Sequence, residues 1–464
     1  MVYVDVNSER FLFYRYFYIG VCVCCGKEFL MLKSFDFVVV GSGVGGATVA
    51  KELSVRGFNV TVLEKGGYHK LGTSWRALSF YTGSFWSFCP GEMSDGGVEV
   101  LRTVMVGGSS VVTLGNGVRA LQKEFKSLGI DLEAEFIEAE KELNVVPMPE
   151  EFMGERTKKL MDASRELGYD VKPMPKFVNF EKCKNCGMCV TGCRYGAKWT
   201  SQRYLGEARK AGAKILTGVS VEKVLHSGGE VKGVRVRGPS GFSDIEAENV
   251  VLAAGGIGTP IILQRSGLTH AGSNLFLDFF VSTFGMLKDG GMRDEIGMAT
   301  LIDEFHESRG FILSPIMDTT MDMFLYLPFL KKFRAFKRGR MLGLMTKITD
   351  DDVGEVHVNG AIHKSVTESD QGKLDKGIEI SRGILVQAGV DPKSLYTSRI
   401  RGAHPGGTAG IGRVVNVDQE TEISRLFVSD ASVFPVSPGA PPVLTIIALS
   451  KRFSKKMVSE YLKG

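Results

Sequence analysis

The feature that most constrains the fold is a glycine-rich turn between a short apolar run and a helical pattern. Residues 35–40 (FDFVVV) form a β-branched run that ends in glycines, as a fully buried strand does. The turn GSGVGG occupies 41–46, and the stretch from Val44 to about Arg56 has helical spacing, closed by Gly57. Residues 59–63 (NVTVL) predict the next buried strand. This order predicts a parallel βαβ unit.

The turn has the spacing G-x-G-x-x-G, which is typical of dinucleotide-binding loops. Gly41 permits the tight turn, Gly43 lets the backbone approach a pyrophosphate, and Gly46 allows the helix to pack closely on the strand. Glu64 ends the second strand, where an acid can bind ribose hydroxyls and disfavours a phosphorylated ribose. We therefore predict a dinucleotide site, although this spacing does not choose between NAD and FAD.

Composition excludes some classes of protein. A chain of 464 residues is long enough for two packed domains, and a net charge of +5 is too small and too dispersed for a nucleic-acid-binding protein. The short spacing of the cysteines favours metal or redox ligands over disulfides, and hence a reducing, cytoplasmic compartment. The eight cysteines are Cys22, Cys24, Cys25, Cys89, Cys183, Cys186, Cys189 and Cys193.

The first thirty residues do not read as part of the fold. Residues 11–25 are apolar, but Arg15 interrupts them and the run is too short to span a bilayer. Met31 opens a segment that looks like the natural start of the domain. We interpret residues 1–30 as a poorly ordered or wrongly assigned extension, with a membrane-interface anchor as the alternative.

The remaining patterns alternate between two kinds of structure. Helical spacing occurs at 131–145 and 155–167, and residues 271–400 become rich in Phe and Met with alternating segments that suggest an antiparallel sheet. The strands we expect are Lys214–Val224 and Val231–Arg237 around a Ser227-Gly228-Gly229 turn, Asn249–Ala254, Gly343–Thr349 and Glu355–His363.

Further blocks resemble the glucose–methanol–choline (GMC) oxidoreductases, in family order from about residue 35 to 460. They are Val106–Ser110 with Asn116, Ile215–Gly218 leading to Val221, Gly255–Pro260 with Ser266-Gly267, Gly402–Thr408, Leu426–Pro435 and Pro442–Ile446. The resemblance implies an α/β fold, in which an FAD-binding, doubly wound (Rossmann-like) parallel-sheet domain carries an inserted antiparallel-sheet substrate domain (α+β). It implies non-covalent FAD contacts from Gly107, Gly108, Ser109, Asn116, Val221 and Asp430. A helix cap or turn is the alternative role of Asp430.

The resemblance also divides the chain. Residues 31–130, 211–270 and 401–464 are expected to form the three parts of the FAD-binding domain. Residues 131–210 are expected to form a helical segment with the cysteine cluster, and residues 271–400 the substrate domain.

His404 lies in a segment that resembles the catalytic HPxGT loop of the family. Histidine suits proton removal from an alcohol because its pKa is near neutrality. The alternative is a buried loop histidine bonded to a carbonyl. The family usually has a second His or Asn where Pro441 stands, and proline offers no side-chain donor or acceptor. This departure puts the details of proton transfer in question.

Cys183, Cys186, Cys189 and Cys193 have the spacing of half a bacterial ferredoxin, without its usual proline. Membrane-bound sugar dehydrogenases of the family carry a three-iron cluster at a similar place, whereas its long-chain alcohol oxidases have a related pattern that implies none. We interpret the motif as the ligands of an iron–sulfur cluster (4Fe-4S or 3Fe-4S). A zinc-bound or structural knot and free thiols are the alternatives.

These patterns predict an FAD-dependent dehydrogenase that acts on the CH–OH group of an apolar alcohol. Its electrons would pass through the cluster to an external carrier, a ferredoxin-like protein or a quinone. The alternatives are a reductase of an apolar C=C or C=O bond and a non-catalytic electron-transfer subunit, the latter suggested by Pro441. Residues 321–348 join an apolar run to a basic one, which suggests either a core element beside a charged face or peripheral membrane contact.

Overall fold

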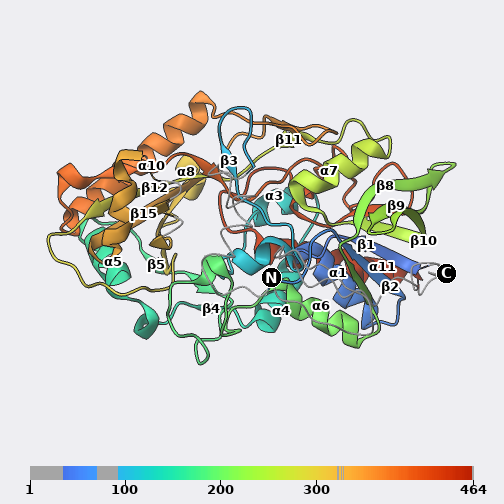
Figure 1. Ribbon diagram of the computed structural model, residues 1–464, viewed down its shortest axis with the longest axis horizontal. Helices are drawn as coiled ribbons and strands as arrows, with labels where there is room; N and C mark the ends of the chain where they lie inside the picture. The colour runs from blue at the N-terminus through green and yellow to red at the C-terminus, as the bar shows by residue number, and fades with distance from the viewer. Residues whose placement is uncertain (1–34, 70–91, 321–322, 325–326, 328, 462–464) are drawn as a thin grey trace, which may run out of the picture. The chain divides into compact units, whose positions relative to one another are not determined.

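The computed structural model describes residues 35–69, 92–320, 323–324, 327 and 329–461. The predicted extension 1–30 lies outside the described residues, as do Cys89 and part of the apolar run that begins at Met321. Two large sheets organise the rest of the chain (Figure 1).

The first sheet is built on a parallel core with the strand order β7-β2-β1-β10, and β20 pairs with β10. The strands are β1 (Phe35–Val40), β2 (Val60–Glu64), β7 (Lys214–Thr217), β10 (Gly241–Leu252) and β20 (Leu426–Val428). Both β1 and β2 are almost wholly buried, as their unbroken apolar runs predict for strands covered on two faces. The predicted βαβ unit is therefore confirmed.

Helix α1, which follows the glycine turn, packs on β1 and β2. Helix α1 contacts α6 and α11, and α11 also contacts α4. The helices are α1 (Val44–Ser54), α4 (Glu133–Leu143), α6 (Ser201–Lys210), α7 (Gly255–Arg265) and α11 (Val443–Tyr461).

Strand β10 belongs to two kinds of pairing. Its first half, from Gly241 to Glu246, pairs antiparallel with β9 (Glu230–Gly238), and its second half pairs parallel with β1. Strand β8 (Ser220–Ser227) completes a hairpin with β9. This hairpin confirms the predicted turn at Ser227-Gly228-Gly229.

Two strand predictions are wrong in their extent. The segment Lys214–Val224 forms two strands, because Gly218 has a left-handed φ of 71° that ends β7 before β8 begins. Likewise Glu355–His363 forms the hairpin of β16 (Gly354–Val356) and β17 (Ile362–His363), which turns at Gly360 with φ 90°. Apolar residues continue to alternate through both turns, so the sequence pattern gave no sign of either turn.

The second sheet is mainly antiparallel, with the order β14-β15-β12-β19-β3, and helix α10 packs along β12 and β15 (Figure 1). Its apolar face joins a cluster that includes Phe279, Leu313, Leu344 and Ile384. The elements are β3 (Glu99–Val100), β12 (Phe279–Met286), β14 (Phe311–Pro315), β15 (Met341–Ile348), β18 (Tyr396–Thr397), β19 (Arg401–Gly402), α5 (Glu155–Glu166) and α10 (Glu368–Gln387). The predicted fold class, a parallel sheet with an antiparallel substrate sheet, is confirmed; the domain boundaries stay predictions.

Short elements connect these layers. The strands are β4 (Val146–Pro147), β5 (Lys172–Pro173), β6 (Pro175–Lys176), β11 (Ser273–Leu275) and β13 (Thr300–Leu301). The helices are α3 (Gln122–Ser127) and α8 (His306–Arg309), with 3₁₀ turns η3 (Gly108–Val112), η4 (Glu150–Phe152), η5 (Cys189–Thr191), η6 (Phe329–Arg340), η7 (Pro392–Ser394) and η8 (Ala431–Val433).

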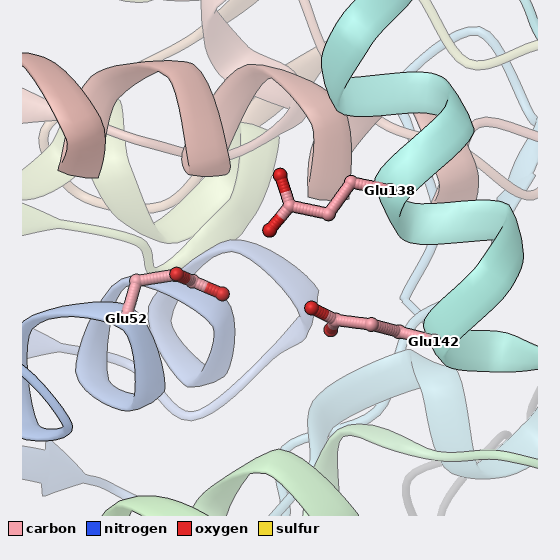
Figure 2. A group of neighbouring side chains, drawn as sticks. All are labelled: Glu52, Glu138 and Glu142. Atoms are coloured by element: carbon pink, nitrogen blue, oxygen red, sulfur yellow. The ribbon is translucent and has the colours of Figure 1, made fainter.

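A buried ammonium group ties α1, α4 and α11 together. Glu52 on α1 and Glu138 and Glu142 on α4 direct their carboxylates toward one another (Figure 2). The Lys451 Nζ atom, on α11, lies 2.7 Å, 2.8 Å and 2.7 Å from oxygens of these three side chains, and the Lys451 side chain is wholly buried. Burial raises the pKa of Glu52, but the hydrogen bond and charge of Lys451 outweigh it and hold that pKa at about 2. Among the described residues, Lys451 is thus the cation that contacts all three carboxylates.

We predict that Lys451→Met lowers the free energy of unfolding by about 3–5 kcal/mol, because it leaves Glu52 buried without its principal cation. Chemical unfolding measured at neutral pH checks this value. In the native protein the Glu52 pKa is depressed, so its contribution is present above pH 4.5 and is lost as the pH falls toward 2. The difference between the two proteins should therefore shrink below pH 4.5. Lys123→Met, at a highly exposed ion pair with Glu307, is the matched control and should change stability little.

Candidate active site

The glycine turn after β1 has the close contacts that its spacing predicts. A Cβ atom at Gly45 would lie 1.7 Å from the Ser429 carbonyl oxygen, and one at Gly46 would lie 2.1 Å from the Gly41 oxygen. Gly41 itself has φ 101°, in the left-handed region. At Gly43, by contrast, a Cβ would meet no atom within 4 Å. The backbone is therefore open where a ligand must approach it.

Glu64 connects this turn to a second glycine loop. Its carboxylate accepts hydrogen bonds from the Ser42 amide (3.0 Å), the Ser42 hydroxyl (2.6 Å) and the Gly66 amide (2.7 Å). The Ser42 Oγ atom in turn accepts a bond from the Gly107 amide at 3.0 Å. Glu64 thus positions both loops, and its predicted contact with a ribose stays a prediction.

The second loop lies directly against the first. Gly107 and Gly108 have φ values of 92° and 53°, and a Cβ at Gly108 would lie 3.0 Å from the Cα of Gly43. The Ser109 Oγ atom accepts a bond from the Thr103 amide at 3.2 Å. Two loops predicted separately as cofactor contacts therefore share one site.

Asn116, another predicted cofactor contact, has its side-chain amide bonded within the protein. Its Oδ1 atom accepts a 2.6 Å bond from Lys176 Nζ, and its Nδ2 atom lies 3.1 Å from the Met298 sulfur. Burial lowers the pKa of Lys176 to about 7. Sequence reasoning did not find Lys176, and the role of Asn116 toward a cofactor stays a prediction.

The Asp430 carboxylate performs the capping role that was the alternative prediction. Its Oδ2 atom accepts bonds of 2.7 Å from the Gly255 amide and 2.7 Å from the Thr259 hydroxyl, and its Oδ1 atom accepts one from Ser432. Burial raises the Asp430 pKa, against these bonds. Val221 pairs with Val236 in the β8–β9 hairpin. The ribityl contact of Asp430 and the adenine contact of Val221 stay predictions.

His404 forms a dyad with a residue that the sequence did not reveal. The His404 Nδ1 atom lies 2.8 Å from the Asp278 Oδ2 atom, and the Asp278 side chain is wholly buried. Burial and the charge of Lys347 lower the His404 pKa, although Asp278 opposes them. Within the described part of the chain, no hydrogen bond engages His404 Nε2. A neutral imidazole is therefore held with one nitrogen fixed and the other available.

A buried network holds Asp278 in place. Its Oδ1 atom accepts bonds from the Ser437 hydroxyl (2.7 Å) and the Gly439 amide (3.1 Å). Asp350 accepts the Asp278 amide at 2.7 Å and pairs with Lys364 at 2.7 Å. Burial raises the Asp278 pKa, but His404 and then Lys347 outweigh it, so the group stays ionised. The sequence signal that could have indicated Asp278 is a single acid within the apolar run LFLDFF, because a buried charge requires partners.

The four predicted cluster ligands line one pocket together with Lys198 and Arg194. All four are free cysteines. The Asn185 amide donates to Cys183 Sγ at 3.4 Å, and the Ala197 amide donates to Cys193 Sγ at 3.3 Å. Burial raises the pKa of the Cys189 thiol, which the charges of Lys198 and Lys176 oppose. The four cysteines therefore line one pocket, and their role as cluster ligands stays a prediction.

This pocket adjoins the second glycine loop, since η5 packs against η3. Lys198 Nζ donates to the carbonyls of Val111 (2.8 Å), Thr113 (2.5 Å) and Cys189 (3.0 Å). One buried lysine therefore ties the cysteine loop to the segment that follows Gly107 and Gly108.

Comparison with known proteins agrees with this geometry. Models of the GMC oxidoreductase family match residues 35–280 and 353–450. The chain belongs to the GMC oxidoreductase family. An uncharacterized protein of Methanocaldococcus jannaschii, MJ1450, is 32% identical over 91% of this chain and 100% of its own length. Long-chain-alcohol oxidase FAO3 of Arabidopsis thaliana is 26% identical over 91% of this chain and 68% of its own length.

Solved structures show the same fold. Pyridoxine 4-oxidase from Mesorbium loti has a TM-score of 0.69 at 18% identity, over 92% of this chain and 99% of its own. A formate oxidase variant from Aspergillus oryzae has a TM-score of 0.73 at 18% identity, over 93% of this chain and 99% of its own. This GMC oxidoreductase is an FAD-dependent enzyme acting on CH–OH donors, as predicted. None of the helices in the described ranges is long and apolar enough to cross a membrane.

The glycine turn fits the pyrophosphate of FAD. The open backbone at Gly43 precedes the first turn of α1, which has no side-chain cap among the described residues, so its amides can face a phosphate.

We predict that Gly43→Ala folds normally but binds FAD at least about tenfold more weakly, since an added methyl occupies space that the pyrophosphate needs. Gly43 has φ −66°, which alanine adopts without strain. Thermal unfolding checks that the variant folds normally, and the flavin absorbance that it retains checks its FAD binding. Gly206→Ala, on α6 and equally open, should leave both unchanged. Full flavin retention by Gly43→Ala would place the pyrophosphate elsewhere.

Proposed function

We propose that this GMC oxidoreductase oxidises the CH–OH group of an apolar alcohol and that His404 is the base. The observation that carries the proposal is the His404–Asp278 dyad, with Nδ1 held at 2.8 Å and the pKa of the ring lowered. A ring that is neutral at neutral pH can accept the hydroxyl proton at Nε2.

His404, Asp278 and Lys347 have different roles in the proton transfer. When bound, FAD supplies the acceptor for the hydride that leaves the alcohol carbon. His404 Nε2 takes the hydroxyl proton, while Asp278 keeps the other proton on Nδ1 and stabilises the imidazolium that forms. Lys347, whose Nζ donates to the Asp278 carbonyl at 3.3 Å, opposes protonation before substrate arrives and so keeps the base free. This arrangement needs no side chain from Pro441.

An apolar substrate is supported by the apolar residues of the strand that follows Asp278. Strands β12 and β15 carry Phe280, Phe284 and Met345 into an apolar cluster that also contains Met298. The similarity to long-chain-alcohol oxidases of Arabidopsis thaliana favours the same class.

Turnover of a dye acceptor with primary alcohols of increasing chain length tests the proposal. We expect kcat/KM to rise with chain length, because each added CH₂ that is buried contributes about 0.8 kcal/mol. Absence of turnover with every alcohol would favour a non-catalytic subunit. Oxidation of chemically reduced enzyme by an apolar enone would favour the reductase alternative.

We predict that His404→Gln lowers turnover by about 10²–10⁴-fold while bound FAD stays normal. Because burial and Lys347 lower the His404 pKa, the native kcat/KM should fall only as the pH drops below about 6.5. Asp278→Asn removes a charge that raises this pKa, so its acid limb should move to lower pH. His270→Gln, at an exposed position, is the matched control. Equal loss of FAD and turnover in His404→Gln would reveal a structural role.

We also propose that Cys183, Cys186, Cys189 and Cys193 hold an iron–sulfur cluster. Their shared pocket and the two amide-to-sulfur bonds support it, since such bonds are typical around cluster thiolates. When bound, a cluster there would supply one-electron transfer from reduced FAD toward a ferredoxin-like protein or a quinone. The contact of η5 with η3 supports this role because it brings the cysteine loop beside the predicted flavin loop.

We predict that Cys189→Ser, purified without oxygen, loses iron and labile sulfide and is reoxidised slowly by one-electron acceptors. Bleaching of FAD by substrate should stay normal, because the transfer of hydride to FAD needs the dyad and the flavin but not the cysteines. Metal analysis, visible absorption and stopped-flow reoxidation provide the readouts. Native protein that contains zinc and no labile sulfide would show a structural knot instead.

A further inference from the structure

The 3₁₀ segment η6 presents a row of apolar side chains to solvent. Phe329, Leu330, Phe333 and Phe336 are 80%, 88%, 74% and 68% exposed. Side chains of this size are usually buried, and several exposed together mark a contact surface. We call these four residues and the basic residues of 329–340 the η6 surface.

The charge of the η6 surface has one sign. Residues 329–340 contain six basic side chains and no acidic one: Lys331, Lys332, Arg334, Lys337, Arg338 and Arg340. In the described part of the chain, Lys331 and Lys337 have no ion-pair partner, and Lys332 lies over the Phe324 ring at 5.5 Å. The lysines therefore keep their charges available to a partner.

The segment is firmly attached to the body of the protein. Ala335 is fully buried, Arg334 donates to the Ser394 carbonyl at 2.7 Å, and Arg338 pairs with Asp294 at 2.7 Å. Arg340 bonds the Leu287 carbonyl at 3.2 Å. Because the arginines bind inward, the exposure of the aromatic rings is a property of a fixed element.

We propose that the η6 surface docks this chain onto a membrane that carries anionic lipid. Aromatic and aliphatic side chains enter the boundary between headgroups and acyl chains, while neighbouring ammonium groups meet lipid phosphates. Charge complementarity decides the occupant. A second copy docked face to face would place the three lysines of one η6 surface against those of the other, whereas an anionic lipid surface neutralises them.

Docking at η6 would bring the membrane close to the dyad. Strand β15 begins at Met341, directly after η6, and carries Lys347, which bonds Asp278. Six residues of strand span about 20 Å. The docking inference does not depend on the proposed alcohol chemistry, but it would give an apolar substrate a short path from the bilayer.

Co-sedimentation of the full chain with vesicles tests the inference. We expect binding to phosphatidylcholine vesicles that contain phosphatidylglycerol, weak binding to phosphatidylcholine alone, and weakening by salt. Lys331→Gln with Lys332→Gln should reduce the affinity about 30-fold. Phe333→Ser with Phe336→Ser should reduce it by at least about tenfold.

Matched variants separate the η6 surface from general effects. Phe242→Ser, at an aromatic side chain that is 69% exposed on β10, and Lys158→Gln with Lys159→Gln on α5 should bind like the native chain. Undiminished binding by the η6 variants, or equal binding to neutral vesicles, overturns the proposal. Self-association without vesicle binding, lost in Phe333→Ser with Phe336→Ser, overturns it in favour of a dimer. None of these readouts requires substrate, so they are independent of the alcohol assay.

Discussion

Close packing at Gly45 and Gly256 determines how the layers around the candidate site are spaced. No Cβ fits at Gly45 beside the Ser429 carbonyl, and none fits at Gly256, where it would lie 2.3 Å from the Pro405 carbonyl. These contacts join α1 to the end of β20, and α7 to the loop that carries His404. Larger residues would separate the layers and open the site. Steric contact therefore helps to place the glycine turn and the His404 loop.

The buried carboxylate of Asp278 connects the two sheets where they meet. Asp278 stands next to β12 with a left-handed φ of 50°, and its carboxylate reaches His404, Ser437 and Gly439. These partners come from the chain beyond residue 400, so one buried acid joins the substrate sheet to the third part of the predicted FAD-binding domain. Such a group is expensive to bury without partners. Its bonds therefore orient His404 and also stabilise the junction.

The sequence predicted the parts of the site that rest on local pattern. The turn at Gly41–Gly46 and the His404 loop could be located because glycine spacing and a family block identify them. Asp278 could not, because its partners are remote in sequence and a lone acid in an apolar run has no period. The alternatives for Asp430 could not be separated either, since a cap and a ribityl ligand require the same residue at a strand end. Gly218 divided an expected strand because its left-handed φ ends β7, and the alternation of apolar residues gives no sign of that turn.

The lysine at the junction of α1, α4 and α11 also sets an order of events during synthesis. Glu52 and Lys451 are 399 residues apart, so at typical elongation rates the ribosome adds the cation about 20–80 s after its carboxylate partner. Until then Glu52 and Glu142 depend on Lys51 and Arg56, so the contact of α1 with α4 lacks the cation that all three carboxylates share. Ser429, whose carbonyl packs against Gly45 in the glycine turn, has also not yet been synthesised. Because Ser429 and Lys451 both lie near the end of the chain, we expect flavin capture to be a late step in maturation.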